Sequence, residues 1–273
     1  MEGKDMVTLY KSPEECEASC MIAAWPGIGD VSLMLARYLR RKLGMEEVGK
    51  VEPFDFFDPS GVSVKDNVVE APRFPESKFY YWRDQESGRG ILLFIGEEQP
   101  LSKGYELANL VLDTGQRFKV KRIYTCAAVL TRIHHAESPQ VWAVATQSKL
   151  LEELRRYRVV LRGDLQIAGL NGLLLGIAKE RGIEGICLLG EVPTYAARIP
   201  IPKASLAVLE VLTEMLGIKI DMDELEGLSR EAEEEMKMVA AEAMGEYIDH
   251  FTTPIWEEEE EEEEESPCLR RER

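Results

Sequence analysis

Short runs of apolar residues alternate with longer amphipathic stretches through most of the chain. The apolar runs are predicted strands, and they lie at residues 21–24, 91–95, 122–130, 141–146, 159–161 and 185–189. The stretches between them are predicted helices, at residues 31–43, 102–114, 147–156, 169–181 and 202–216. Continuous apolar strands that alternate with helices indicate a sheet covered on both faces. The sequence therefore predicts an α/β fold of three α/β/α layers with a mostly parallel sheet, in a core domain of residues 1–220.

Residues 48–82 do not follow this alternation. They consist of short β-like pieces separated by Pro and Gly, and they contain no helical stripe. We expect this segment to add an edge to the sheet or to form a contact surface.

A glycine turn joins the strand at residues 21–24 to the helix at residues 31–43. Its sequence is Trp25-Pro26-Gly27-Ile28-Gly29-Asp30. Backbone N–H groups at such a helix start often hold phosphate. This turn, however, lacks the third glycine of a dinucleotide fingerprint and the Gly-Lys-Ser/Thr of a P-loop, and Asp30 would repel an anion. We expect a structural turn with Trp25 packed nearby and Asp30 capping the helix, and a ligand site is the alternative.

Polar side chains follow several of the predicted strands. Ligands in open parallel sheets usually lie beyond the carboxyl ends of the strands, so these side chains would form an acidic, amide-bearing site if their loops converge. Residues 190–195 are expected to be one of these loops. The candidate pocket or interface residues come from the strand ends and from the helix near residue 171: Trp25, Gly27, Gly29, Asp30, Glu97, Gln99, Asn171, Glu191 and Tyr195.

No catalytic, cofactor-binding or metal-binding residue is assigned. The sequence has no Gly-x-Ser-x-Gly elbow, His-Glu-x-x-His helix or paired Cys-x-x-Cys. The adjacent residues His134 and His135 point in different directions and are more typical of a loop or an interface than of catalysis.

The acidic residues are concentrated near the end of the chain. The formal net charge is −17, yet residues 1–220 hold 28 Lys plus Arg against 29 Asp plus Glu. A nearly neutral body without a basic stripe argues against nucleic acid as a partner. No apolar run approaches the roughly 20 residues that span a bilayer, and no signal sequence is recognised, so we expect a cytoplasmic protein.

Two further segments follow the core domain. Residues 221–250 are predicted to form an acidic amphipathic helix, because apolar residues follow one face from Leu225 to Tyr247 and glutamates cover the rest. Such a stripe can pack on the body or against another subunit. Residues 251–273 contain an unbroken glutamate run and are predicted to be a disordered acidic tail.

Five short blocks occur in a distinctive order and spacing. They are Trp25-Pro26-Gly27-Ile28-Gly29, Gly96-Glu97-Glu98-Gln99-Pro100, Gly169-Leu170-Asn171-Gly172, Leu189-Gly190-Glu191-Val192-Pro193-Thr194-Tyr195 and Leu216-Gly217-Ile218. Together they resemble the proteasome assembly chaperone family, in the form found in archaea and bacteria. The resemblance covers about residues 20 to 235.

This resemblance implies an α/β/α body similar to nucleoside phosphorylases, self-association and, in some members, assistance to the assembly of proteasome α-subunits. It implies no catalytic residues and no cofactor. Family members that dock on the proteasome ring end with a hydrophobic residue, a tyrosine and one final residue. This chain ends in Arg271-Glu272-Arg273, and its last tyrosine is Tyr247. It therefore departs from the family pattern at the position on which that docking route depends.

We expect a non-catalytic interaction protein, a chaperone-like or scaffold factor that is related to proteasome assembly and acts as a homo-oligomer. Proteasome subunits are the partners that the resemblance suggests, and neither nucleic acid nor membrane is expected. The alternative is a protein or enzyme that binds a nucleoside or nucleotide with the loops at the strand ends.

Overall fold

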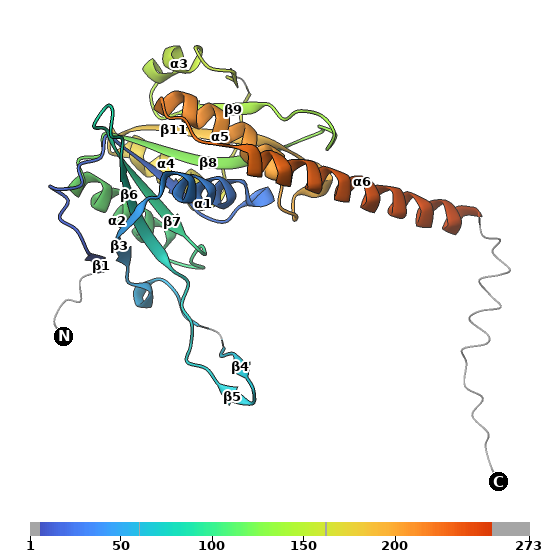
Figure 1. The fold of residues 1–273 in the computed structure, drawn as a ribbon, viewed down its shortest axis with the longest axis horizontal. Helices are drawn as coiled ribbons and strands as arrows, with labels where there is room; N and C mark the ends of the chain where they lie inside the picture. The colour runs from blue at the N-terminus through green and yellow to red at the C-terminus, as the bar shows by residue number, and fades with distance from the viewer. Residues whose placement is uncertain (1–5, 60, 162, 253–273) are drawn as a thin grey trace, which may run out of the picture. The chain divides into compact units, whose positions relative to one another are not determined.

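A nine-stranded sheet forms the centre of the molecule (Figure 1). The computed structural model describes residues 6–59, 61–161 and 163–252. The strand order is β1-β3-β6-β7-β2-β8-β11-β9-β10. The four central strands are parallel to one another: β7 (Gly90–Gly96), β2 (Cys20–Ala24), β8 (Arg122–Thr131) and β11 (Glu184–Pro193). Their apolar sequences fit this place, because both faces of a central parallel strand are covered.

Antiparallel pairs extend the sheet on both sides of this centre. On one side β6 (Ser77–Arg83) pairs with β7, β3 (Glu46–Val51) with β6, and β1 (Val7–Leu9) with β3. The segment at residues 48–82 therefore does contribute to a sheet edge. On the other side β9 (Val141–Ala145) is antiparallel to β11, and β10 (Val159–Val160) is parallel to β9.

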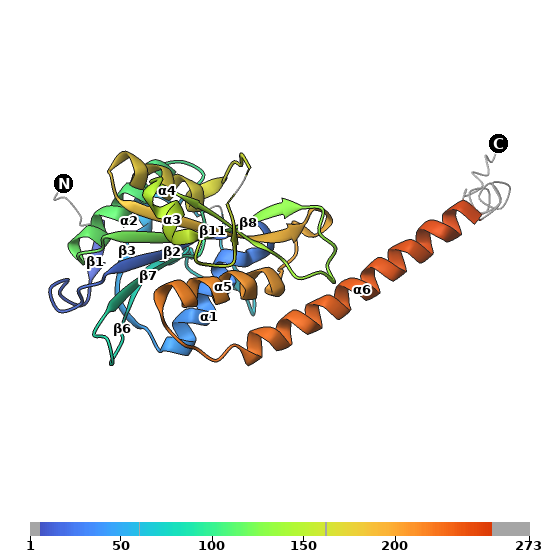
Figure 2. The same cartoon turned by 90° about the horizontal axis from the view of Figure 1, so that it is seen from above.

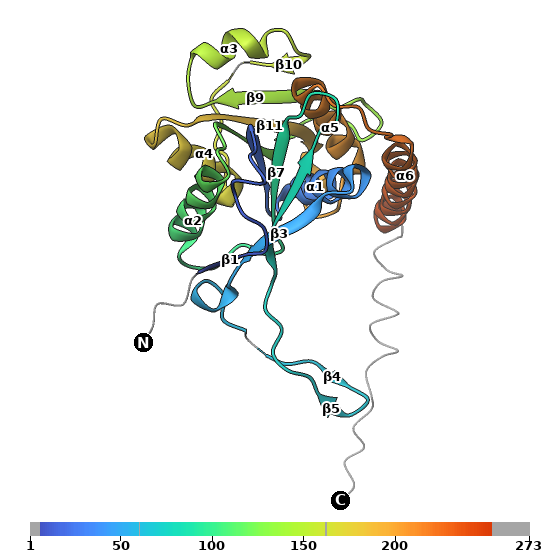
Figure 3. The same cartoon turned by 60° about the vertical axis from the view of Figure 1, so that its left-hand side comes forward.

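Helices cover both faces of the sheet, as the sequence predicted. Helices α2 (Gly104–Arg117) and α4 (Gly169–Glu180) pack together on one face, and α1 (Val31–Leu43) and α5 (Pro202–Leu216) pack together on the other (Figures 2 and 3). The short helix α3 (Lys149–Leu154) contacts β9. Three-residue 3₁₀ helices lie at Ile28–Asp30, Pro53–Asp55 and Thr194–Ala196. The predicted α/β class with three layers is confirmed.

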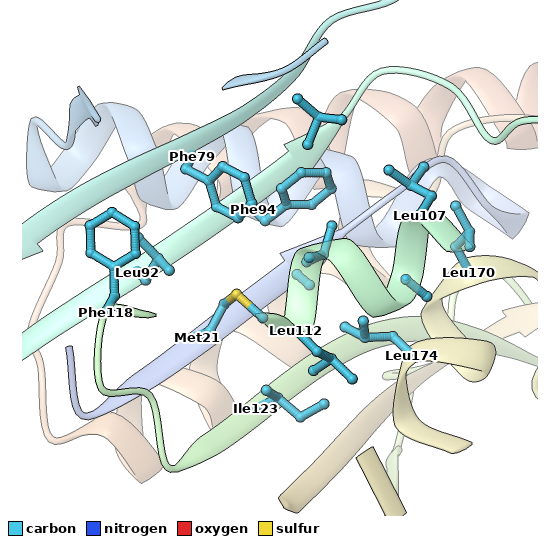
Figure 4. Close-up of a cluster of buried hydrophobic side chains, with 14 of the residues drawn as sticks. Met21, Phe79, Leu92, Phe94, Leu107, Leu112, Phe118, Ile123, Leu170 and Leu174 are labelled. Atoms are coloured by element: carbon cyan, nitrogen blue, oxygen red, sulfur yellow. The ribbon is translucent and has the colours of Figure 1, made fainter. Parts of the chain in front are cut away.

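The main hydrophobic core lies between the sheet and the helices α2 and α4 (Figure 4). It brings together Met21 from β2, Phe79 from β6 and Phe94 from β7, all fully buried. Leu107 and Leu174 approach them from α2 and α4. Full burial of one such side chain contributes about 1.5–3 kcal/mol, so this cluster is a main source of stability.

The predicted loop at residues 190–195 is wrong for its first four residues. Strand β11 continues to Pro193, because each of its ten residues pairs with β8 in parallel register from Glu184–Arg122 to Pro193–Thr131. Only the 3₁₀ helix Thr194–Ala196 leaves the sheet. Glu191 is therefore a strand residue, and the pleat of the strand sets the direction in which its side chain points.

A small two-stranded ribbon leaves the sheet between β3 and β6. Strands β4 (Val64–Lys65) and β5 (Val68–Val69) are antiparallel and form a separate sheet, which stands away from the main one in Figures 1 and 3. Asp66 and Asn67 join them with positive φ angles of 50° and 62°. Two consecutive left-handed residues are typical of a type I′ hairpin turn, and Asn and Asp tolerate that conformation.

The chain divides into two compact units, residues 1–229 and residues 230–273. Helix α6 (Asp223–Thr252) begins in the first unit, where Leu225 is buried and Arg41 pairs with Glu224 at 2.8 Å. The proposed boundary near residue 220 thus lies just before this helix. The predicted acidic tail lies outside the described residues from residue 253 onward. Among the helices that the structure describes, none has the length and apolarity to cross a membrane.

A network of charged side chains ties β8 to β11 at their amino ends. Arg122 donates to Glu184 from Nε at 3.0 Å and from Nη2 at 2.8 Å, and its Nη1 lies 2.6 Å from Glu153. Lys149 adds a second cation 2.6 Å from Glu184. Hydrogen bonds from Lys149 and Arg122 lower the pKa of the Glu184 carboxyl.

An Arg122→Met variant should lose about 1 kcal/mol of unfolding free energy, since these side chains remain partly exposed and water screens them. The stabilisation that the ionised Glu184 carboxyl contributes is present above the ordinary glutamate pKa. It is lost as the pH falls through the lowered pKa of this carboxyl. Urea unfolding of both proteins at low and high salt measures the first effect, and unfolding over a range of pH from 7 to below the ordinary glutamate pKa measures the second. Arg155→Met is the matched control, because its pair with Glu152 is far more exposed and should contribute almost nothing. Equal losses in the two variants would contradict the role of the network.

Candidate functional site

The carboxyl ends of the four parallel strands lie at one edge of the sheet. Because β7, β2, β8 and β11 are consecutive neighbours, the loops that follow them are neighbours too. The loops are therefore side by side, and a shared site also requires that their polar side chains meet. What these loops form depends on where their polar groups point.

Trp25 lies beneath this edge and is fully buried. Its ring is 4.9 Å from that of Phe94, centroid to centroid. Gly96, at the end of β7, leaves the space that the indole fills: a Cβ atom on Gly96 would lie 2.5 Å from two indole atoms. The indole nitrogen has no hydrogen-bond partner in the described part of the chain. Trp25 is thus a packing residue, as expected, and is not open to a ligand.

Two amide side chains fix the backbone that follows Trp25. The Trp25 N–H donates to Asn171 Oδ1 at 3.2 Å, and Asn171 Nδ2 donates back to the Trp25 carbonyl at 3.3 Å. Gln99 Nε2 donates to the Pro26 carbonyl at 2.6 Å, while its Oε1 accepts the Leu170 N–H at 2.9 Å. We call Gln99 and Asn171 the amide latch. It joins the loop after β2 to the loop after β7 and to the start of α4.

The glycine turn uses its backbone groups within the protein. The Gly29 N–H donates to the Ala197 carbonyl at 3.4 Å, and the Gly29 carbonyl accepts from the Ile201 N–H at 2.8 Å. The Asp30 N–H donates to the Gly27 carbonyl at 3.1 Å. Gly29 is buried with φ +65°, and a Cβ there would lie 3.2 Å from both Ile201 and Val192. These contacts favour the structural turn over a phosphate loop, whose amides would have to face a ligand.

The predicted cap by Asp30 is wrong. Asp30 holds the N-cap position of α1, but its backbone is left-handed, with φ 51°, and its side chain makes no capping bond. A capping side chain needs an extended backbone to reach the N2 or N3 amide. The carboxyl is instead half-buried near Arg37, and burial raises its pKa, an effect that Arg37 partly offsets.

Replacing Asp30 by Asn should therefore raise the melting temperature at pH 7. A carboxyl whose native pKa is raised is destabilising when charged, and this penalty disappears as pH falls toward the ordinary value of 3.8. The increase in melting temperature that Asn gives should become smaller as the pH falls. What remains at low pH is the tolerance of Asn for a left-handed backbone. Thermal melts of both proteins from pH 7 down to pH 4 measure it. An increase in melting temperature that becomes larger as the pH falls would contradict the raised pKa of the Asp30 carboxyl.

The other candidate residues point toward separate neighbours. Glu97 accepts the Glu76 N–H at 2.9 Å on the β6 side. Glu191 accepts from Trp142 Nε1 at 3.1 Å and from the Gln140 N–H at 2.9 Å on the β9 side. These two carboxylates therefore fix local structure at opposite ends of the edge.

Tyr195 joins the histidine loop, while its side chain is largely exposed. Its hydroxyl accepts the His135 N–H at 2.9 Å and lies 3.0 Å from His135 Nδ1. The rings of His134 and His135 lie next to each other, with centroids 4.0 Å apart and planes tilted by 35°, so the expectation that they point in different directions is wrong. The tyrosine hydroxyl thus holds a loop in place.

A shallow depression lies beside the glycine turn. Its volume is about 380 Å³, and it is lined by Gly27–Asp30 and by residues 197–200, including Arg198. The segment at residues 197–200 was not recognised from the sequence, because it has no periodic pattern and follows a 3₁₀ helix. The nine candidates therefore include three buried residues, Trp25, Gly29 and Asn171, and two carboxylates at opposite ends of the edge, and the glycine turn borders one shallow hollow.

Comparison with known proteins identifies the family to which the chain is similar. Residues 21–240 match the model of the PAC2 family. The chain is 31% identical over 221 residues to the protein MJ1210 of Methanocaldococcus jannaschii, which covers 79% of this chain and 81% of that protein.

Solved structures agree with the family match. PbaB from Pyrococcus furiosus, described as an archaeal proteasome activator, is 31% identical with a TM-score of 0.74, over 86% of this chain and 98% of PbaB. The proteasome-assembly chaperone homologue Rv2125 of Mycobacterium tuberculosis has a TM-score of 0.70 over 84% of this chain and 99% of its own, and at 18% identity it shows the shared fold. The family indicated by the five sequence blocks is confirmed, and the chain belongs to the PAC2 family.

Proposed function

We propose that this protein is a chaperone-like interaction factor of proteasome assembly or activation and that it acts as a homo-oligomer. The observation that carries the proposal is the likeness to the proteasome activator PbaB, at 31% identity over nearly the whole of both chains. A cytoplasmic location stays a prediction from the sequence.

The surface at the carboxyl ends of the strands supports an interaction role. Its backbone is held by the amide latch, and its carboxylates accept bonds from neighbouring backbone and indole groups. A surface fixed in this way binds a partner without first having to be ordered, which reduces the entropic cost of association. It also presents apolar side chains to solvent, including the exposed Ile28 and Ile199.

Affinity purification from the source cell tests the proposal. The full chain should recover proteasome α-subunits, and a chain truncated after Thr252 separates the body from the acidic end. If the surface at the carboxyl ends of the strands makes the contact, the truncated chain retains binding. If neither form recovers a proteasome subunit at low salt, the proteasome role is wrong. Sedimentation of the purified protein tests self-association separately.

A small-molecule role is the second candidate, and the hollow beside the glycine turn supports it. Arg198 gives that hollow one cationic group, opposite the half-buried Asp30. Thermal shift with nucleosides, nucleotides and inorganic phosphate is the test, because a ligand at 100 times its dissociation constant stabilises by about 2.7 kcal/mol. Arg198→Ala is the matched variant and should abolish a shift caused by an anion. The absence of a shift with every probe would reject this role.

A further inference from the structure

The segment that joins β10 to α4 lies over one face of the main sheet. Its residues 163–168 belong to no helix or strand. Leu165 and Ile167 pack against a small buried cluster that contains Cys187 and Leu189 of β11. The cluster lies on the face that α4 covers, because Leu175 of that helix completes it. We call residues 163–168 the strap.

Side chains hold the strap in place, whereas backbone hydrogen bonds do not. Within the described residues, no backbone N–H from Asp164 to Ala168 donates a hydrogen bond. Leu165 and Ile167 are half-buried, while Gln166 between them is exposed. Segments with few buried contacts and solvent-exposed backbone groups open at a lower free energy than the body of a protein. The strap has both of these features.

An apolar strip of the sheet packs on the same cluster. Cys187 pairs with Val144 of β9, and Leu189 pairs with Trp142 of β9, so these side chains share one face. The half-buried members of the strip come from β8 and β9: Ala127, Val129, Trp142 and Val144. Proteins rarely expose a contiguous apolar surface of this kind without a function for it. The strap supplies part of the cover of this strip.

Glycines fix the backbone at both ends of the strap. Gly163 and Gly169 have φ angles of +88° and +73°, which other residues rarely adopt. A Cβ on Gly163 would lie 3.3 Å from the Trp142 indole. Where the strap enters α4, a Cβ on Gly172 would lie 2.0 Å from the Ile167 carbonyl oxygen, so the missing side chain makes room for the strap. The strap therefore bends at defined points, and only its middle rests on side-chain contacts.

We propose that the strap is a lid, which opens about Gly163 and Gly169 while the rest of the sheet stays folded and thereby uncovers the apolar strip of β8, β11 and β9. The population of the open state then sets how much apolar surface the protein exposes. This inference goes beyond the proposed function. Its tests use the purified chain without any partner, so its failure would leave the proteasome-related role and self-association untouched.

Two buried thiols distinguish opening of the strap from global unfolding. Cys187 lies in the cluster that the strap contacts, and burial raises the pKa of its thiol to about 12. Cys126 is also fully buried, and burial raises its pKa as well. It lies on the opposite face of the sheet, because its neighbour Thr125 is the residue that pairs with Cys187. Only the thiolate reacts readily, so both thiols are unreactive while they are covered.

Modification of the native protein by N-ethylmaleimide, followed by mass spectrometry of its peptides, compares the two thiols in one sample. Opening of the strap exposes Cys187 and leaves Cys126 covered. Cys187 should therefore react about tenfold faster than Cys126. Equal rates would mean that only global unfolding uncovers Cys187, and they would overturn the proposal.

Two neighbouring substitutions in the strap test its contact with the sheet. Leu165→Ala removes a half-buried side chain that packs on the cluster, whereas Gln166→Ala removes an exposed one. Leu165→Ala should raise the reaction rate of Cys187 about tenfold and leave that of Cys126 unchanged. Gln166→Ala should change neither rate. Equal effects of the two variants on Cys187 would contradict a strap that is held closed by its apolar side chains.

A substitution outside the strap tests its entry into α4. Gly172→Ala places a methyl group against the Ile167 carbonyl and should favour the open strap, so Cys187 should react faster and Cys126 should not. Gly176→Ala is the control in the same helix, since nothing lies within 4 Å of a Cβ there. Equal acceleration of both thiols in Gly172→Ala would show that the strap opens only with the whole core, and it would overturn the proposal. The wild-type comparison decides by itself if a variant fails to fold.

Discussion

An Asn171→Ala variant is expected to lose about 3 kcal/mol of unfolding free energy. Asn171 is only 3% exposed, and both halves of its amide bond the backbone of Trp25. Alanine would leave a buried N–H and a buried carbonyl without these partners, and each such group costs about 1–3 kcal/mol. The loss should appear at the loop after β2 as well as in global stability.

Urea unfolding followed by intrinsic tryptophan fluorescence, with hydrogen exchange of the Trp25 amide, measures this loss. Asn109→Ala is the control. That half-buried side chain on α2 donates to the Tyr105 carbonyl, 2.8 Å away, and accepts from Arg181, and water can replace both bonds, so its removal should cost less. Equal losses of unfolding free energy in the two variants would show that burial does not raise the cost of losing these amide hydrogen bonds. A stable Asn171→Ala protein with a protected Trp25 amide would mean that another group replaces the bond.

A Gly96→Ala variant is expected to lose at least 1–3 kcal/mol, because the added methyl group overpacks a rigid site. The new Cβ would lie 2.5 Å from Cδ1 and Nε1 of the Trp25 indole, which Phe94 confines on one side. The indole is fully buried, so it cannot move into solvent without disturbing the residues that cover it. The strand end or the ring must therefore move.

Gly176→Ala is the control for Gly96→Ala, and it should have the opposite sign. Nothing lies within 4 Å of a Cβ at Gly176, an exposed helical position in α4. Alanine there should stabilise the helix by about 0.5–1 kcal/mol. Thermal and urea unfolding of the two variants compare one added methyl group in two environments. Stabilisation by both would contradict the tight packing of Gly96 against Trp25.

The sequence predicted the layers of this fold well and its local turns poorly. Apolar runs and amphipathic stripes report burial directly, so the strands that became β2, β7 and β8 and the helices on both faces were visible in the pattern. The continuation of β11 through Glu191 was missed because pairing with β8 outweighs the turn signal of Gly190 and Pro193. The left-handed backbone of Asp30 follows from the contacts of Gly29 with Ile201 and Val192, which are distant in sequence.

The candidate site, too, could be predicted from the sequence only in part. Trp25, Gln99 and Asn171 belong to one connected set, and their shared place was expected because all three lie near predicted strand ends or in the sequence blocks. That the two amides bond backbone instead of facing solvent could not be predicted, since it depends on the approach of α4 to the β2 loop. The ribbon was recognised only as a possible contact surface, because four residues of strand carry too little periodicity to define a face.

The position of β2 in the sheet has a consequence for how the chain folds during synthesis. Cys20 pairs with Ile91 on one side and with Arg122 on the other, so this central strand is made long before either of its neighbours in the sheet. Contacts so distant in sequence slow folding, because long loops must close before they contribute. The apolar residues of β2 have no partner on one side until β7 is made and none on the other side until β8 is made, near the middle of the chain. An assembly factor of this kind is therefore itself a nascent chain that depends on protection from aggregation until β8 arrives.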